Sequence, residues 1–102
     1  MYTVKETLIF QRQASEIWSA AERDEFIDWI SANPLSGDVI PGAGGLRKVR
    51  WSRTGVGKRG GTRVIYFNKL DIGLIVLLTV YSKTVSDNLS AAFLRQLKSI
   101  EG

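Results

Sequence analysis

The chain of 102 residues is 44% hydrophobic and carries a formal net charge of +4, which suits one globular domain over residues 1–102 with an acidic or nucleic-acid partner. It contains neither cysteine nor histidine. Disulfides, thiolate nucleophiles and Cys-based zinc sites are therefore excluded, and any acid–base step must use Lys, Tyr, a carboxylate or a group on a partner.

The N-terminal third predicts one strand and two helices. Alternating and then continuous apolar residues favour a strand over residues 4–10, and a short helix over residues 11–18 follows. Ser19 and Glu22 match a capping box, and the apolar spacing after them predicts a helix that ends near Asn33, before Pro34. We expect Trp18 and Trp29, which lie in these helical patterns, to be core residues.

The remaining two thirds predict a meander of three strands and a last helix. Residues 35–45 are rich in turn formers, and strands follow over residues 46–51, 62–69 and 74–81. The last strand is apolar on both faces, as a central strand would be. Ser90 is the expected N-cap of a helix that reaches residue 100.

The order β-α-α-β-β-β-α predicts an α+β fold with a small, mainly antiparallel sheet. We expect the helices to pack mainly on one face of this sheet and the basic residues to occupy the other. The start of the chain lacks the apolar region of a signal peptide, and the apolar run over residues 74–78 is too short to cross a bilayer. We therefore expect a cytoplasmic protein without membrane contact.

The basic residues are concentrated between residues 39 and 70, where no Asp or Glu occurs. The rest of the chain holds six basic and ten acidic residues. Such a concentration of like charge is repulsive unless an anionic partner relieves it. The basic residues of this window are Arg47, Lys48, Arg50, Arg53, Lys58, Arg59, Arg63 and Lys69.

The strand pattern predicts that part of this charge converges. The pleat over residues 46–51 puts Lys48 and Arg50 on one face, with Arg47, Val49 and Trp51 on the other. Charges on adjacent strands meet in space, and Arg and Lys that converge suit phosphate binding. Two other interpretations stay open: a solvated, charge-rich sheet face, and a docking surface for an acidic protein.

Two further patterns require interpretation. Residues 55–60 match GxGxxG, but they join two strands with no helix after them, which favours a hairpin tip over a dinucleotide site. Tyr81, at the end of the apolar strand, either fills an edge or presents its hydroxyl to the basic face, where it can contact a phosphate or a base. For Trp51, burial under the helices is favoured over stacking, and one of Tyr66 and Phe67 is expected in the core.

With these residues in place, the chain resembles the RelE/ParE superfamily of toxins from bacterial type II toxin–antitoxin systems, and within it the HigB-like branch. The resemblance covers nearly the whole chain. It is carried by Asn33-Pro34, by Gly37-Asp38-Val39-Ile40-Pro41-Gly42, by Gly44-Gly45-Leu46-Arg47-Lys48-Val49-Arg50-Trp51, by Gly57-Lys58-Arg59-Gly60-Gly61, by Arg63-Val64-Ile65-Tyr66 and by Tyr81-Ser82-Lys83.

The resemblance implies a RelE-like fold and a ribosome-dependent mRNA endonuclease that inhibits translation. It implies attack by the RNA 2′-hydroxyl on its own phosphodiester, without a metal or other cofactor. It also implies a cognate antitoxin with a helix-turn-helix DNA-binding part, through which the complex, and not the toxin alone, contacts operator DNA.

The resemblance also assigns site residues by position. The basic pair of the first meander strand falls on Lys48 and Arg50, the arginine of the next strand on Arg63, and the basic residue after the last strand on Lys83. The family's later tyrosine falls near Leu89, so that either Tyr81 substitutes for it or the role is absent, and the histidine of some HigB relatives has no counterpart. We expect Arg47, Arg53, Lys58 and Arg59 to contact RNA.

In this scheme Arg50, Arg63 and Lys83 stabilise charge on the phosphate. Lys48, crowded by cations, is the candidate base, and Lys83 or Tyr81 protonates the leaving 5′-oxygen. Two alternatives remain: a gyrase poison of the ParE type, against which the clustered basic residues argue, and a nucleic-acid or protein-binding module without chemistry.

Overall fold

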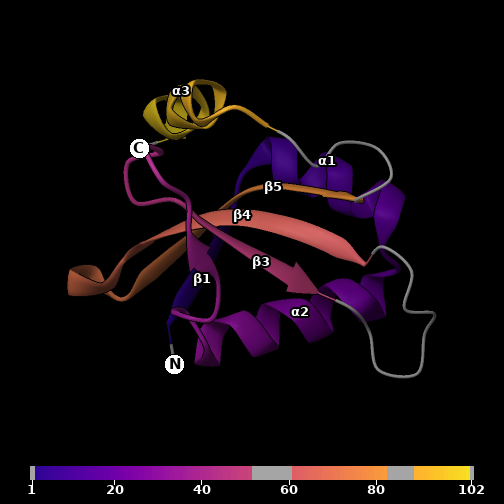
Figure 1. Cartoon of the computed structure of the whole chain (residues 1–102). Coiled ribbons are helices and arrows are strands. Elements are labelled where there is room, and N and C mark those ends of the chain that lie inside the picture. Colours follow the sequence, from indigo (N-terminus) through magenta and orange to yellow (C-terminus); the bar gives the residue numbers. More distant parts are fainter. Residues whose placement is uncertain (1, 52–60, 83–88, 102) are drawn as a thin grey trace.

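The computed structural model describes residues 2–51, 61–82 and 89–101, and its elements form one five-stranded sheet with helices on both faces (Figure 1). The strand order is β1-β5-β4-β3-β2, in which β1 and β5 are parallel and the other neighbours antiparallel. No helix of the described part is long and apolar enough to cross a membrane. The elements are β1 (Thr3–Glu6), α1 (Leu8–Ile17), α2 (Ala20–Ala32), β2 (Asp38–Val39), β3 (Arg47–Trp51), β4 (Thr62–Lys69), the 3-10 helix η1 (Leu70–Ile72), β5 (Leu74–Ser82) and α3 (Ala91–Glu101).

Two hydrophobic cores form, one on each face of the sheet. Helices α1 and α2 pack on one face with Phe10, Phe26 and Tyr66, and α3 packs on the other with Phe67 and Leu94. Helices α2 and α3 accordingly lie on opposite sides of the sheet in Figure 1. The α+β, mainly antiparallel architecture is thereby confirmed, with two of the three helices on one face. Both Tyr66 and Phe67 are buried, because each faces one of the two cores.

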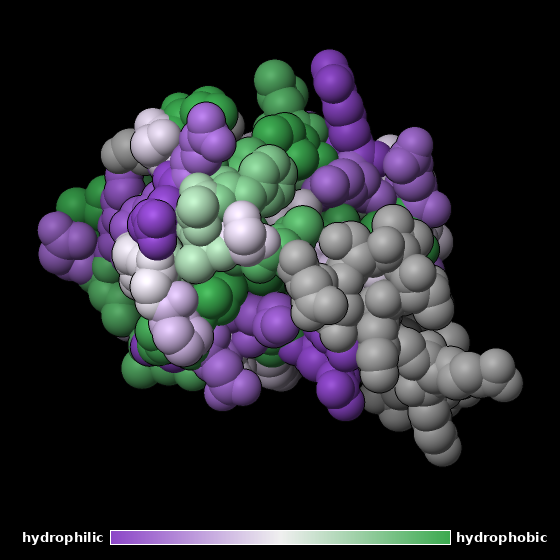
Figure 2. Space-filling view, turned by 45° about the horizontal axis from the view of Figure 1, so that its top comes forward, coloured by the Kyte–Doolittle hydropathy of each residue, from purple (hydrophilic) through white to green (hydrophobic). Residues whose placement is uncertain are grey.

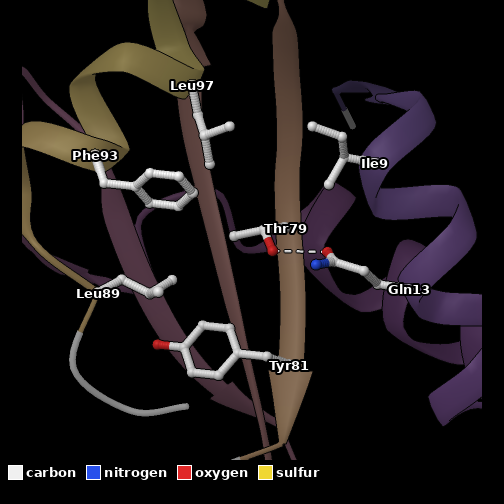
Figure 3. Close-up of a pocket in the computed structure, with 7 residues that line it drawn as sticks. All are labelled: Ile9, Gln13, Thr79, Tyr81, Leu89, Phe93 and Leu97. Atoms are coloured by element: carbon white, nitrogen blue, oxygen red, sulfur yellow. Dashed lines mark hydrogen bonds between the residues drawn. The ribbon is translucent and has the colours of Figure 1, made fainter. Parts of the chain in front are cut away.

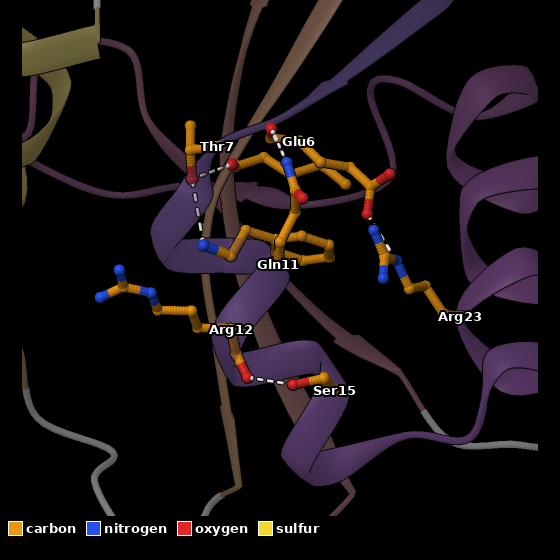
Figure 4. Close-up of polar contacts among 8 residues, drawn as sticks. Glu6, Thr7, Gln11, Arg12, Ser15 and Arg23 are labelled. Carbon is orange, nitrogen blue, oxygen red and sulfur yellow. Dashed lines mark hydrogen bonds and ion pairs between the residues drawn. The ribbon is translucent and has the colours of Figure 1, made fainter.

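The expected strand over residues 4–10 is wrong beyond Glu6. Thr7 caps α1: its Oγ1 accepts the N–H of Phe10 at 3.1 Å, and the same hydroxyl donates to the carbonyl of Leu77 at 2.9 Å (Figure 4). Leu8–Ile17 is therefore helical from its first apolar residue. The hydroxyl stabilises both the start of the helix and its attachment to β5.

Helix α1 also covers the edge of β5 that β1 leaves open. Strand β1 pairs with β5 only as far as Leu77. Beyond that point the Oε1 of Gln13 accepts the backbone N–H of Val80 at 3.0 Å and the hydroxyl of Thr79 at 2.6 Å. A side chain on a helix thus supplies the acceptor that a neighbouring strand would otherwise provide.

The second helix begins as predicted. The Oγ of Ser19 accepts the Glu22 N–H at 3.2 Å, and the Glu22 carboxylate accepts the Ser19 N–H at 3.0 Å, which completes the capping box. Arg23 then donates to Glu6 at 2.7 Å, which joins α2 to the end of β1 (Figure 4). The hydrogen bond from Arg23 to Glu6 raises the pKa of this guanidinium above its ordinary value.

Aromatic side chains close the α2 side of the core. Trp18 is buried, and Trp29 and Trp51 are half-buried against the same cluster. The ring centroids of Trp29 and Trp51 lie 5.0 Å apart, and Trp51 meets Phe26 edge-on at 5.3 Å. The burial favoured for Trp51 is therefore partial, and its indole packs on α2.

A bulge in β5 changes which residues share a face. Ile65 pairs with Thr79 and Tyr66 with Leu77, so Leu78 has no partner in β4. Strict alternation from Leu77 would put residue 81 on the α1–α2 face. The unpaired Leu78 shifts the alternation of faces by one residue, and Tyr81 therefore joins the α3-side core.

Candidate active site

Three basic residues and one carboxylate line an open pocket of about 320 Å³ at the β2–β3–β4 end of the sheet. The basic residues are Lys48 and Arg50 of β3 and Arg63 of β4, and the carboxylate is that of Asp38 in β2. Arg50 and Asp38 are exposed, Lys48 is half-buried, and Arg63 is only 5% exposed. The pocket therefore has charged walls and one deeply seated guanidinium.

The strand registers explain why these cations meet. Arg50 is the direct cross-strand partner of Arg63, and Lys48 lies two residues before Arg50 on the same face. The predicted pleat of β3 is confirmed, since Val49 and Trp51 contact the α1–α2 core. Like charges directly opposite one another destabilise a sheet, and this pairing is therefore suited to an anion held between the two guanidinium groups.

The expectation that Lys48 is crowded by cations alone is wrong. The basic window itself lacks Asp and Glu, but Asp38, the residue immediately before it, forms the two-residue strand β2. Its partner in the antiparallel register is Lys48. The pocket thus contains a carboxylate, and Lys48 is not surrounded by cations alone.

Asp38 is held in place by hydrogen bonds to the residue before it, Gly37. The hydroxyl of Tyr66 accepts the Gly37 N–H at 2.9 Å and donates to the carbonyl of Pro34 at 2.8 Å. Arg47 donates to the carbonyl of Gly37 at 2.7 Å. A Cβ on Gly37 would lie 2.9 Å from two atoms of Tyr66, so only glycine fits there without movement. The turn that carries Asp38 is therefore anchored to the sheet.

The same contacts account for Arg47. It lies on the other face of β3 from Lys48, with its guanidinium against the carbonyls of Leu35 and Gly37. Its position connects the 35–37 turn to β3 and does not add a fourth cation to the pocket.

Tyr81 lies beside the pocket, on the same face as its cross-strand partner Arg63. It is 7% exposed and also lines a second, mainly apolar cavity of about 260 Å³ between α1 and α3 (Figure 3). In Figure 3 the Tyr81 side chain points towards Leu89 and the α3 side of this cavity. The residues drawn there are Ile9, Gln13, Thr79, Tyr81, Leu89, Phe93 and Leu97.

Helix α3 is fixed over the second core by its own basic side chains, a feature that sequence reasoning missed. Arg95 donates to the carbonyl of Gly42, and Lys98 donates to that of Gly44. Ser90 caps the helix as expected, since its Oγ accepts the Phe93 N–H at 3.1 Å. Apolar residues still reach the surface on this side of the molecule, as the space-filling view shows (Figure 2).

Four of the expected site residues, Arg53, Lys58, Arg59 and Lys83, lie outside the described residues, as does the GxGxxG segment. Among the residues that the structure describes, no three His, Cys, Asp or Glu side chains gather as metal ligands. The part of the site that the structure shows is thus Lys48, Arg50 and Arg63, with Tyr81 adjacent and Asp38 as the addition.

The sheet order, the parallel β1–β5 pair and the helices on both faces make up a fold that solved structures of a bacterial toxin share. A mutant of the E. coli toxin RelE in the free state shares this fold with a TM-score of 0.64 and 13% identity, over 97% of each chain. The isolated E. coli RelE toxin gives a TM-score of 0.59 and 11% identity, over 98% of this chain and 99% of that one. No protein-family model matches the sequence.

Proposed function

We propose that this protein is the toxin of a type II toxin–antitoxin system and a ribosome-dependent mRNA endonuclease of the HigB-like branch. The observation that carries the proposal is the convergence of Lys48, Arg50 and Arg63 in one open pocket on a RelE fold. Convergent guanidinium and ammonium groups are suited to the oxygens of a phosphodiester.

The chemistry requires little beyond positioning and charge. The 2′-hydroxyl of the message attacks the adjacent phosphorus in line, the bond to the 5′-oxygen breaks, and a 2′,3′-cyclic phosphate remains. Arg50 and Arg63, opposite one another across two strands, would bind the phosphate oxygens on which negative charge develops. Both backbones are fixed in the sheet, so the two strands already bring these side chains to the same place before the RNA binds. The basic residues Arg53, Lys58, Arg59 and Lys83 are proposed to contribute further contacts to RNA or phosphate.

The apolar cavity of Figure 3 is the surface that we propose for the antitoxin. Ile9 of α1 is 38% exposed and Phe93 of α3 is 46% exposed, and both line this cavity. An apolar segment of the antitoxin placed between them would bury both side chains and would reach Tyr81, next to Arg63. The antitoxin would in this way bind beside the catalytic pocket.

The proposal is tested by mapping the 5′ ends of cellular messages after induction of the toxin, with translation running and with translation blocked. We expect new ends within translated coding regions, their loss when translation is blocked, and recovery of growth when the neighbouring gene is co-expressed. Cuts that persist in untranslated RNA would instead define a free ribonuclease. An SOS response without message cleavage would favour the gyrase poison, and unaffected growth would favour a binding module.

A further inference from the structure

We propose that Asp38 is the general base of this site, and that its carboxylate takes the proton of the attacking 2′-hydroxyl. This inference rests on the proposed ribonuclease function. Among the four side chains that line the pocket, Asp38 alone carries no positive charge, and it is the proton acceptor that the other three lack. It belongs to no pattern of apolar residues, and only the pairing of β2 with β3 brings it to the site.

The placement of Asp38 is specific. Its partner Lys48 lies directly across the β2–β3 pair, and Arg50 and Arg63 line the same pocket. On the chain, Asp38 follows Gly37, which the buried Tyr66 hydroxyl holds at 2.9 Å. On its other side, the Ile40 N–H donates to the Leu46 carbonyl at 2.9 Å. Both ends of this short strand are thus fixed.

The geometry also supplies a balanced proton path. As the 2′-oxygen bonds to phosphorus, its proton passes to the Asp38 carboxylate. As the bond to the 5′-oxygen breaks, the leaving oxygen takes a proton from the Lys48 ammonium. The proton on Asp38 then passes through water to Lys48, its partner across the β2–β3 pair, and both groups regain their starting charge. Lys48 acts here as the acid, the reverse of the base role that a purely cationic pocket suggests.

The experiment compares the wild type with Asp38→Asn, Asp38→Glu and Asp71→Asn. Single-turnover cleavage of message on programmed ribosomes is followed for each protein. Binding is measured separately on ribosomes whose message has a 2′-deoxynucleotide at the cut site. Asp71 is an exposed aspartate in η1, so its substitution makes the same charge change on a different part of the molecule.

We expect Asp38→Asn to reduce the cleavage rate about 10²–10⁴-fold with binding retained. Asp38→Glu, which keeps a carboxylate, should recover part of the rate, and Asp71→Asn should match the wild type. If Asp38→Asn binds message more tightly and cleaves at the wild-type rate, Asp38 is only a counter-charge and the inference fails. A wild type that cleaves nothing would instead overturn the proposed function itself, so the two failures are distinct.

Discussion

The hydroxyl of Tyr66 accepts the backbone N–H of Gly37 at 2.9 Å across 29 positions of the chain. This contact joins the second strand of the meander to the turn that carries the pocket carboxylate. A fully buried aromatic side chain therefore serves two purposes: its ring fills the α1–α2 core, and its hydroxyl fixes the position of Asp38.

Replacement of Tyr66 by Phe tests this link. The change leaves the buried Gly37 N–H without its acceptor, which costs about 1–3 kcal/mol of unfolding free energy, whereas the Pro34 carbonyl keeps the hydrogen bond that Asn68 donates at 2.9 Å. Urea denaturation measures the loss, and cleavage on ribosomes should slow because Asp38 is no longer held. Tyr2→Phe is the matched control and should change stability by less than about 0.5 kcal/mol. Equal stability of the two variants would show that the hydrogen bond between Tyr66 and Gly37 does not stabilise the fold.

Replacement of Arg63 by Ala tests the phosphate site. The guanidinium lies deepest in the pocket, and its loss should reduce single-turnover cleavage about 10²–10³-fold. Arg50→Ala should have a similar effect, because the two residues are cross-strand partners. Circular dichroism confirms that each variant folds. Lys5→Ala, on exposed β1, removes the same charge away from the pocket and should leave the rate unchanged; a fall in rate for this variant would point to a non-specific charge effect.

Substitution of Gln13 tests whether its side chain stabilises the edge of β5 by accepting hydrogen bonds from that strand. Gln13→Met removes the acceptor of the Val80 N–H and of the Thr79 hydroxyl, and should lower the unfolding free energy by about 1–3 kcal/mol. Gln13→Glu keeps an oxygen acceptor and should stay close to the wild type in thermal unfolding. Gln96→Met, on the exposed surface of α3, is the control for the loss of an amide. If Gln13→Glu is as unstable as Gln13→Met, the hydrogen bonds that the Gln13 oxygen accepts are not what stabilises this edge.

Phe93 tests the proposed antitoxin surface. Phe93→Ser removes a half-exposed aromatic ring from the α1–α3 cavity and should weaken antitoxin binding by about 1–2 kcal/mol, roughly ten-fold or more in Kd. Calorimetric titration with the antitoxin measures this, while cleavage on ribosomes should persist. Ala92→Ser, exposed on the same helix, should bind as the wild type does. Unchanged affinity of Phe93→Ser would place the antitoxin elsewhere.

Sequence reasoning was most reliable where local chemistry dictates structure. Ser19 and Glu22 specify the start of α2 through side chains three residues apart, and the alternation in β3 separates Lys48 and Arg50 from Val49. Helix α1 was mistaken at its start because Leu8–Phe10 is apolar enough for a strand, and the only helical signal there is the cap residue Thr7.

The features that escaped prediction depend on tertiary contacts. Strand β2 has two residues and no periodicity, so only its pairing with β3 makes it a strand, and Asp38 was missed as a pocket residue for that reason. The bulge at Leu78 leaves no mark in the sequence, yet it places Tyr81 on the face of Arg63. Residues far apart in the chain fix both features, and a local pattern carries no information about them.

The two outer strands of the sheet, β1 and β2, have four and two residues, and α1 covers the part of β5 that β1 leaves open. The stretch of β3 beyond β2 bears the charged Arg50. Short edge strands and charged side chains on an edge disfavour edge-to-edge association between copies. Copies of this chain should therefore stay separate in the absence of a partner, which for the proposed toxin is the state without antitoxin.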